Sequence, residues 1–302
     1  MKTLASTTTS KKRLLGFFAV LVTVVAVVAI IGLLISMFGT FVVQGSGQLS
    51  WTFLTEAPRN NNTEGGIFPA IFGTTILVLL MTLLGVPVGT ATAIYLSEYA
   101  RQSAAFARAV RFAVNTLAGV PSIVFGLFGV GFFIQFVGGG IDNVTAGAVF
   151  GKPALLWASA TLAVLTLPVV IVSVEEALRA VPRELREASL ALGATKWQTI
   201  TKVVLPNSVS GILTGSILAV GRGAGEVAAI LFVGVVYSLE RLPSSVTDQF
   251  MHLGYHLYVL STQSPDVEKT LPLQYATTLV LLGLTFVLNF SAIYVRSRLR
   301  RI

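Results

Sequence analysis

The chain has 302 residues, of which 54% are hydrophobic and only 11% are charged, and its mean hydropathy is +0.82. This composition excludes a soluble globular protein and indicates an integral membrane protein. No cysteine is present, so neither a disulfide framework nor a thiolate metal site is available. The net charge of +8 does not indicate nucleic-acid binding, because the basic residues cluster at the ends of apolar runs.

The N-terminal 13 residues are polar, basic and rich in Ser and Thr, which favours a disordered cytoplasmic tail. No charged residue occurs between Leu14 and Thr55. The apolar run over 14–43 is longer than the core of a signal peptide, which has about 7 to 15 residues. We therefore expect the first membrane span there, and a single transmembrane domain over residues 14–302.

Five further apolar runs predict spans near residues 69–96, 112–137, 154–174, 206–237 and 273–295. The expected fold is therefore an all-α, polytopic membrane protein with six transmembrane helices. Pro121 lies within the third run and is expected to break or kink that helix. The segments 44–68, 138–153 and 238–272 are expected to be loops on the far side of the membrane.

The distribution of Lys and Arg predicts the orientation. Sixteen of these residues fall on the side that carries both termini, and four fall in the three loops on the other side. Because basic residues favour the cytoplasmic side of a membrane, both termini are expected in the cytoplasm.

A charged segment over residues 175–206 separates the fourth and fifth runs. Pro182 and Glu184 suit the start of a helix, Gly193 interrupts it, and Thr195 can cap a second helix. The pattern therefore predicts a helix, a glycine turn and a second helix beside the membrane.

The spacing of this segment resembles the EAA loop of ABC importer permeases, in which Glu-Ala-Ala is followed by Gly, an aliphatic residue and Leu-Pro. The corresponding positions are Glu187, Ala188, Ser189, Gly193, Val203, Leu205 and Pro206, with Ser189 in place of the second Ala and Val203 in place of the usual Ile. The resemblance implies a type I ABC importer permease fold, and it implies that this segment docks on a separate cytoplasmic ATPase that uses ATP.

Four other stretches are similar to phosphate-type ABC importer permeases: GGIFPAIFGT at 65–74, AIYLSEYA at 93–100, GVPSIVFGLFG at 119–129 and LGATKWQTITKVVLP at 192–206. The stretch GRGAGEVAAILFVG and the C-terminal end are closer to the PstA-type than to the PstC-type. The resemblance implies a permease for inorganic phosphate in the bacterial inner membrane. Its partners would be a PstC-like second permease, a PstB-like ATPase dimer and a PstS-like extracytoplasmic phosphate-binding protein.

Two other interpretations of the function stay open. A permease for another oxyanion, such as sulfate or molybdate, would use the same features. A stand-alone channel or secondary carrier would need no ATPase dock, and the internal repeats common in carriers are not evident.

Arg222 and Glu226 are the two charges expected inside a span, where an ionisable residue costs at least about 2.5 kcal/mol at the helix centre. Their i, i+4 spacing would place them on one helical face, where they could pair. Arg222 is expected to line the translocation path for an oxyanion, with Glu226 as its partner. A purely structural ion pair is the alternative.

No other residues indicate chemistry. His252 and His256 have the spacing of zinc ligands but lack a third ligand, so we expect no metal site. Gly151-Lys152 is followed by Pro153 and does not fit a nucleotide-binding loop. No catalytic cluster is found, so the chain is expected to be a transport subunit without a bound cofactor.

Overall fold

The computed structural model describes residues 4–59, 64–101, 104–264 and 267–299. Within these residues, six helical segments are long and apolar enough to cross a membrane, which confirms the predicted number. They are Leu15–Gln48, Phe68–Tyr99, Ser122–Thr145, Leu155–Arg179, Lys196–Ala224 and Glu268–Arg298. The all-α class is also confirmed, because the strands within the described ranges have two residues each.

The elements follow in chain order. They are α1 (Leu4–Gly45), η1 (Ser46–Gln48), α2 (Trp51–Thr55), β1 (Pro58–Arg59), β2 (Glu64–Gly65), α3 (Phe68–Ile94), η2 (Tyr95–Tyr99), α4 (Ala105–Ala118), α5 (Ser122–Phe128), η3 (Gly129–Gly138), α6 (Gly139–Thr145), α7 (Leu155–Arg179), α8 (Arg183–Ala191), α9 (Lys196–Thr199), η4 (Ile200–Val204), α10 (Leu205–Ala224), β3 (Val235–Val236), β4 (Phe250–Met251), α11 (Leu253–Thr262) and α12 (Val267–Leu299).

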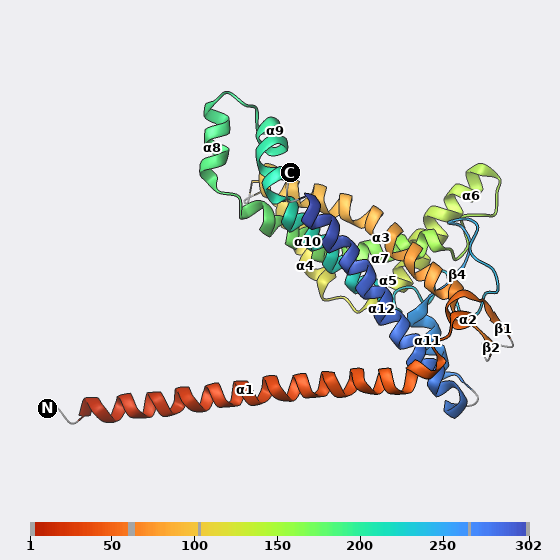
Figure 1. Cartoon of the computed structure of the whole chain (residues 1–302). Coiled ribbons are helices and arrows are strands. Elements are labelled where there is room, and N and C mark those ends of the chain that lie inside the picture. The colour runs from red at the N-terminus through yellow and green to blue at the C-terminus, as the bar shows by residue number, and fades with distance from the viewer. Residues whose placement is uncertain (1–3, 60–63, 102–103, 265–266, 300–302) are drawn as a thin grey trace.

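Helix α7 forms the centre of the bundle and packs against α3 and α10 (Figure 1). It is the most buried of the six spans, with 67% of its apolar window covered. Glycine allows this close packing: a Cβ added at Gly89 of α3 would lie 2.7 Å from Val170 Cγ1 of α7. Small residues at such crossings let membrane helices approach, because backbone and side chain then meet without a gap.

Helix α1 lies apart from the bundle and meets the rest of the chain near its C-terminal end, where it contacts α12 (Figure 1). There the rings of Phe41 and Tyr275 lie 6.1 Å apart. The helix begins at Leu4, so the backbone of residues 4–13 is helical and the expected disordered tail is wrong for these residues. Residues 1–3 of that tail lie outside the described residues.

The third span begins later than expected. Helix α4 ends at Ala118, Gly119 to Pro121 interrupt the helix, and the span runs from Ser122 to Thr145. Pro121 has an extended backbone (ψ 139°) immediately before α5. Proline has no N–H to continue the preceding helix and disfavours helical geometry at the residue before it. The expected span over 112–137 therefore divides at this residue.

The fifth span ends earlier than expected. Helix α10 stops at Ala224, and a turn at residue 225 and further turns over residues 228–234 lead to β3. The expected helix to Tyr237 is wrong because three glycines in five residues weaken it. The turns instead pack on α5, where a Cβ added at Gly126 would lie 3.1 Å from the carbonyl oxygens of Ala228 and Ala229.

The expected loop over 238–272 contains regular structure. Strand β4 pairs in parallel with β3, and α11 follows directly. His252 caps α11, since its Nδ1 accepts hydrogen bonds from the backbone N–H groups of Gly254 and Tyr255 at 3.2 and 3.4 Å. This part of the chain therefore folds onto the end of the bundle.

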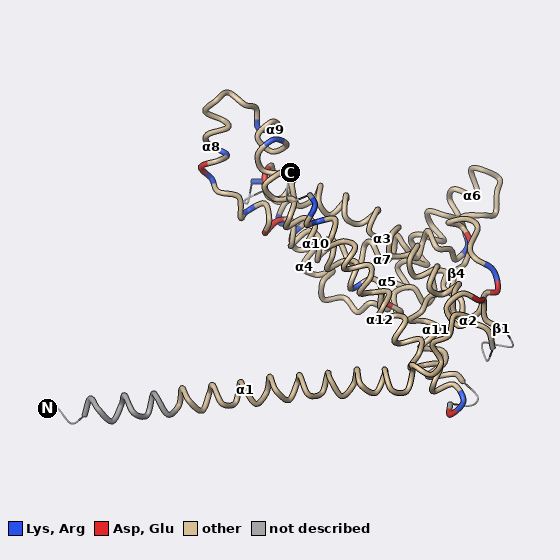
Figure 2. Tube along the Cα trace, in the orientation of Figure 1, with Lys and Arg blue, Asp and Glu red and all other residues tan. Residues whose placement is uncertain are grey.

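The bundle has two distinct ends. Helices α8 and α9 lie at one end together with the end of α12, and α6, α2 and α11 lie at the other (Figure 1). Lys and Arg gather around α8 and α9, while the middle of the bundle is almost free of charge (Figure 2). We refer below to these as the α8 end and the α11 end.

Candidate functional site

The charged segment after α7 folds as a helix, a turn and a helix that project from the α8 end (Figure 1). Pro182 lies at the N-cap position of α8, one residue before the first helical position that was expected for it. Gly193 has φ +84°, a left-handed conformation that ends α8 and that residues with a Cβ adopt at a cost. The predicted glycine turn is therefore present, and Gly193 has open space around it.

Hydrogen bonds fix the second helix of the segment. The Thr195 hydroxyl accepts from Gln198 N at 3.3 Å, and the Thr195 N–H donates to Gln198 Oε1 at 2.8 Å. This capping box starts α9. Ser189 Oγ and Thr199 Oγ1 lie 3.0 Å apart, so the two helices of the segment are also joined to each other.

The segment exposes apolar as well as polar side chains. No residue of α8 is buried, and the side chains of Leu190, Leu192 and Trp197 are 50%, 90% and 63% exposed. Glu187, Ala188 and Gly193 lie on the same exposed segment, whereas Ser189 is half-buried. Leu205 and Pro206 begin α10. An exposed apolar group of this kind indicates a surface that another protein covers.

Arg186 joins the base of α8 to the bundle. Arg186 of α8 forms an ion pair with Glu98 of η2 and donates a hydrogen bond to the Leu178 carbonyl at 2.6 Å. Each of the three groups belongs to a different part of the chain. The ion pair is largely enclosed, with side chains 21% and 9% exposed.

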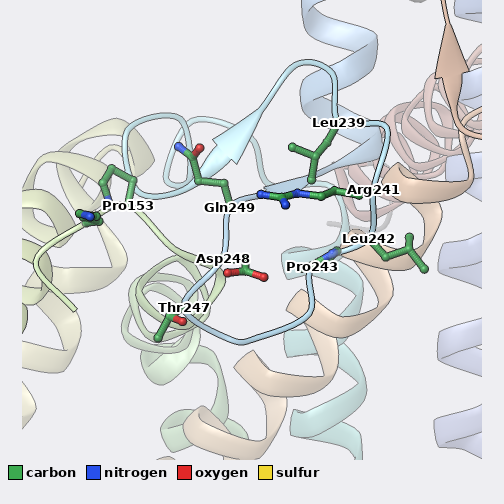
Figure 3. A pocket seen from close by; sticks show the side chains of 9 residues that line it. Pro153, Leu239, Arg241, Leu242, Pro243, Thr247, Asp248 and Gln249 are labelled. Atoms are coloured by element: carbon green, nitrogen blue, oxygen red, sulfur yellow. The ribbon is translucent and has the colours of Figure 1, made fainter. Parts of the chain in front are cut away.

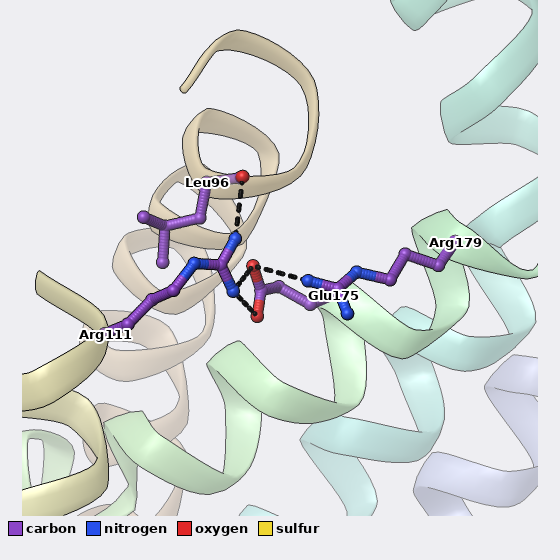
Figure 4. A network of polar contacts seen from close by, with 4 residues as sticks. All are labelled: Leu96, Arg111, Glu175 and Arg179. Carbon is purple, nitrogen blue, oxygen red and sulfur yellow. Dashed lines mark hydrogen bonds and ion pairs between the residues drawn. The ribbon is translucent and has the colours of Figure 1, made fainter. Parts of the chain in front are cut away.

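A second arginine, Arg111 of α4, contacts α7 and η2 (Figure 4). Its Nη1 lies 3.0 Å from Glu175 Oε2 and 2.9 Å from Glu175 Oε1, and its Nη2 donates to the Leu96 carbonyl at 3.0 Å. Arg179 approaches the same carboxylate from the other side, at 3.9 Å. Neither ion pair was expected from the sequence. Glu98 and Glu175 stand at the ends of apolar runs, but nothing in the sequence identifies their partners.

Arg222 lies in the last turn of α10, and its side chain is exposed in this chain. Its neighbour Gly223 packs on Met81, which lies near the middle of α3, so the arginine lies at the depth of the central part of the bundle. A guanidinium at this depth must face protein or water rather than lipid.

Glu226 does not share a helical face with Arg222. It follows Gly225, where α10 has already ended, and its backbone N–H donates to the Gly223 carbonyl at 3.3 Å. Across the described part of the chain, no ion pair joins the two side chains. The expected pair on one helix is therefore wrong, because the helix stops between them.

The two histidines are buried at the α11 end. Burial lowers the pKa of His252 to about 4, and a contact with the Ala224 backbone opposes this effect. Burial also lowers the pKa of His256 to about 4, against an opposing contact with the Tyr237 backbone. Among the described residues, no group of three His, Cys, Asp or Glu residues could hold a metal ion. His252 caps α11, and the ring of His256 stacks on Tyr237 with the ring centroids 5.9 Å apart.

A pocket of about 320 Å³ opens at the α11 end, between the loop before α7 and the loop before β4 (Figure 3). Lys152, Arg241 and Asp248 line it. Asp248 accepts hydrogen bonds from the hydroxyl and N–H of Ser244, both at 2.8 Å, and from the Ser245 N–H. The Ser244 hydroxyl is the main cause that lowers the pKa of Asp248. Lys152 thus belongs to a surface pocket.

Comparison with known proteins gives a consistent result. A family model described as "Binding-protein-dependent transport system inner membrane component" matches residues 85–301. The chain is 30% identical over 266 residues to the probable ABC transporter permease protein YqgI of Bacillus subtilis (strain 168), covering 84% of each. It is 39% identical over 220 residues to the phosphate transport system permease protein PstA 1 of Mycobacterium tuberculosis (strain CDC 1551 / Oshkosh), covering 72% of this chain and 67% of that protein.

Solved structures share the fold. A chain of a bacterial ABC transporter involved in the import of the acidic polysaccharide alginate superposes with a TM-score of 0.66 at 18% identity, covering 96% of this chain and 98% of that one. A chain of the bacterial alginate ABC transporter in complex with its pentasaccharide-bound periplasmic protein gives a TM-score of 0.67 at 17% identity, covering 97% of each.

Proposed function

Because this chain belongs to the family of binding-protein-dependent transport system inner membrane components, we propose that it is the permease subunit of an ATP-driven importer of inorganic phosphate. The assignment of inorganic phosphate as the substrate is based on the 39% identity to a phosphate transport system permease over 220 residues. The chain is a transport subunit and not an enzyme, since the relatives are permeases and ATP is hydrolysed by a separate subunit.

The α8 end is the proposed ATPase dock. The segment from α8 to α9 projects from the bundle, exposes Leu190, Leu192 and Trp197, and is joined to the bundle by the Arg186–Glu98 ion pair. An ATPase dimer that binds the exposed side chains would move α8. The Arg186–Glu98 ion pair would transmit this movement to the second span. The motif positions Glu187, Ala188, Ser189 and Gly193 lie within this segment, and Leu205 and Pro206 begin α10.

The orientation follows from the same proposal. An ATPase works in the cytoplasm, so the α8 end, where α12 also ends, is the proposed cytoplasmic end, and we propose that both termini lie in the cytoplasm. The α11 end then faces outward, where an extracytoplasmic phosphate-binding protein would deliver its cargo. A multi-pass chain in the bacterial inner membrane accords with the excess of Lys and Arg around α8 and α9.

Arg222 is the proposed contact of this chain with the translocated anion. Its side chain is exposed and has no ion pair within the described residues, so its charge is available to a ligand. A guanidinium presents forked donors that match phosphate oxygens. A homologous second permease would cover this face of α10 and complete a path between the two subunits. Glu226, after the end of the helix, is proposed to lie beside the path without pairing with Arg222.

The test is uptake of labelled phosphate at low external phosphate, in cells that lack the chain and in cells to which it is restored. We expect uptake that requires the chain and that excess sulfate does not reduce. Dependence on the chain for sulfate or molybdate uptake instead would assign the permease to another oxyanion.

A further inference from the structure

A cleft of about 590 Å³ lies at the base of α8, between the end of the second span and the junction of α7 with α8. Four arginines line it, namely Arg111, Arg179, Arg183 and Arg186, together with the carboxylate of Glu187. These arginines come from α4, α7 and α8. Of these four arginines, only Arg186 takes part in the contacts that join α8 to the bundle.

Two of the four arginines are balanced by protein groups. Arg111 binds Glu175 and the Leu96 carbonyl (Figure 4), and Arg186 binds Glu98 and the Leu178 carbonyl. Their charges are therefore compensated, and their guanidinium planes are held in place by two groups each.

The other two arginines have charge to spare. Arg183 is exposed and forms no ion pair within the described ranges. Arg179 is 58% exposed and reaches Glu175 only at 3.9 Å, and that carboxylate already binds Arg111. Among the described residues that line the cleft, Glu187 is the one carboxylate, so this lining carries one net positive charge after the two ion pairs are counted.

We propose that this cleft binds a phosphate-type oxyanion between Arg179 and Arg183. Forked guanidinium donors favour phosphate oxygens, and the net positive charge of the lining favours an anion. On the proposed orientation the cleft lies at the cytoplasmic membrane surface. Two sources share this chemistry there: inorganic phosphate in the cytoplasm and the phosphate of an anionic lipid headgroup.

An anion bound in the cleft would restrain the movement of the segment from α8 to α9. Arg179 ends α7 and Arg183 begins α8, so an anion bound to both spans the joint formed by residues 180–182. A joint held in this way moves less freely when an ATPase pulls on α8. The bound anion would therefore regulate transport from the cytoplasmic side. The regulatory role and the placement rest on the proposed function, whereas binding itself depends only on the arginines.

The test uses the absence of cysteine from the chain. Ser97 and Ala100 line the cleft, and either Ser97→Cys or Ala100→Cys places a single thiol of this chain in it. The complete complex with its second permease and ATPase is reconstituted in nanodiscs of phosphatidylcholine, or of phosphatidylcholine with phosphatidylglycerol. The rate of modification of this chain by N-ethylmaleimide, a neutral reagent, is measured with inorganic phosphate or with chloride at equal ionic strength.

We expect bound anion to slow the modification by about tenfold at saturation, because an occupied cleft excludes the reagent. Slowing by phosphate in phosphatidylcholine assigns free phosphate, and slowing by phosphatidylglycerol without phosphate assigns the lipid. Arg179→Gln with Arg183→Gln should abolish the effect. Arg298→Gln, at an exposed arginine that hydrogen-bonds Tyr294, should leave it unchanged.

Equal rates under all conditions for both thiol positions would overturn the proposal, as would protection that persists in the double glutamine variant. The assay needs no transport, so its result is separate from that of the uptake experiment. If the complex binds phosphate in the cleft but imports sulfate, the cleft proposal stands and phosphate is wrong as the transported substrate.

Discussion

Arg186 of α8 pairs with Glu98, which lies 88 residues earlier in the chain at the end of the second span. The Glu98 side chain is only 9% exposed, and Arg186 also holds the Leu178 carbonyl near the end of α7. A single guanidinium thus joins the segment that we propose to meet the ATPase to two of the membrane spans. We propose that the route from ATP to the translocation path runs through this contact.

Replacement of Arg186 by Ala is the first prediction. It leaves the enclosed Glu98 carboxylate without a partner, which costs on the order of 3 kcal/mol for a buried pair. We expect thermal inactivation of the detergent-solubilised complex at a lower temperature, and uptake that falls more than ATP hydrolysis does.

A double-mutant cycle isolates the contact. Arg186→Ala and Glu98→Ala together should cost less than the sum of the two single changes, because the second change removes the orphaned charge. Additive losses would mean that the ion pair does not join the two elements. Arg298→Ala, an exposed arginine at the same end, serves as the matched control.

Gly193 supports a second prediction, because its φ of +84° favours residues that tolerate left-handed backbone. No atom lies within 4 Å of a Cβ added there, so the cost of substitution comes from the backbone alone. Asn adopts this conformation readily and a β-branched residue does not. We expect Gly193→Asn to retain the ATPase in a pulldown and Gly193→Val to lose much of it. Equal retention by both variants would mean that the turn does not shape the dock.

Arg222 supports a third prediction. Its exposed side chain has no ion pair within the described residues, so removal leaves no buried partner unpaired and assembly should survive. We expect Arg222→Ala to abolish phosphate uptake while the complex purifies in normal yield. Leu218→Ala, on the same helix and 53% exposed, is the control. Normal uptake by an assembled Arg222→Ala complex would remove this residue from the path.

The buried histidines predict a pH dependence of stability. Burial lowers the pKa of His252 and His256 from 6.5 to about 4, so both are neutral in the folded state. Between these values the unfolded chain binds more protons, so stability is complete above about pH 6.5 and falls as the pH drops toward 4. The loss is about 3 kcal/mol for each histidine. The thermal midpoint of the complex, measured across this range, should fall accordingly.

A conservative variant separates titration from packing. His252→Asn keeps an acceptor for the N–H groups of Gly254 and Tyr255 but cannot be protonated. Its complex should lose less stability than the wild type as the pH drops. An unchanged pH profile would show that His252 is not the group that titrates.

The sequence predicts the membrane spans and the segment from α8 to α9 well, because both depend on the local pattern of apolar, charged and glycine residues. Long uncharged runs identify the six helices. Gly193 predicts the turn after α8, and the structure confirms this turn with a left-handed backbone at Gly193. The same local reasoning fails at Ala224. There the apolar residues after Gly225 look helical, yet they pack as turns against Gly126 of α5. Only the tertiary contact decides between the two.

The ion pairs cannot be predicted from the sequence, because they also depend on tertiary packing. Arg111 and Glu175 are 64 residues apart, and each has several possible partners at the same end of the bundle. Their pairing depends on how α4 crosses α7, which the break at Pro121 makes possible. Arg222 and Glu226 show the reverse case, in which a spacing that suggests a pair is cancelled by the end of the helix.

Transport by the purified complex tests the central claim most directly. The chain, its second permease and its ATPase are reconstituted in vesicles with ATP on the ATPase side, and the binding protein is added opposite with labelled phosphate. We predict ATP-dependent accumulation of phosphate that requires this chain and that excess sulfate does not inhibit. Accumulation of sulfate or molybdate in its place, or phosphate movement that continues without ATP, would contradict the account.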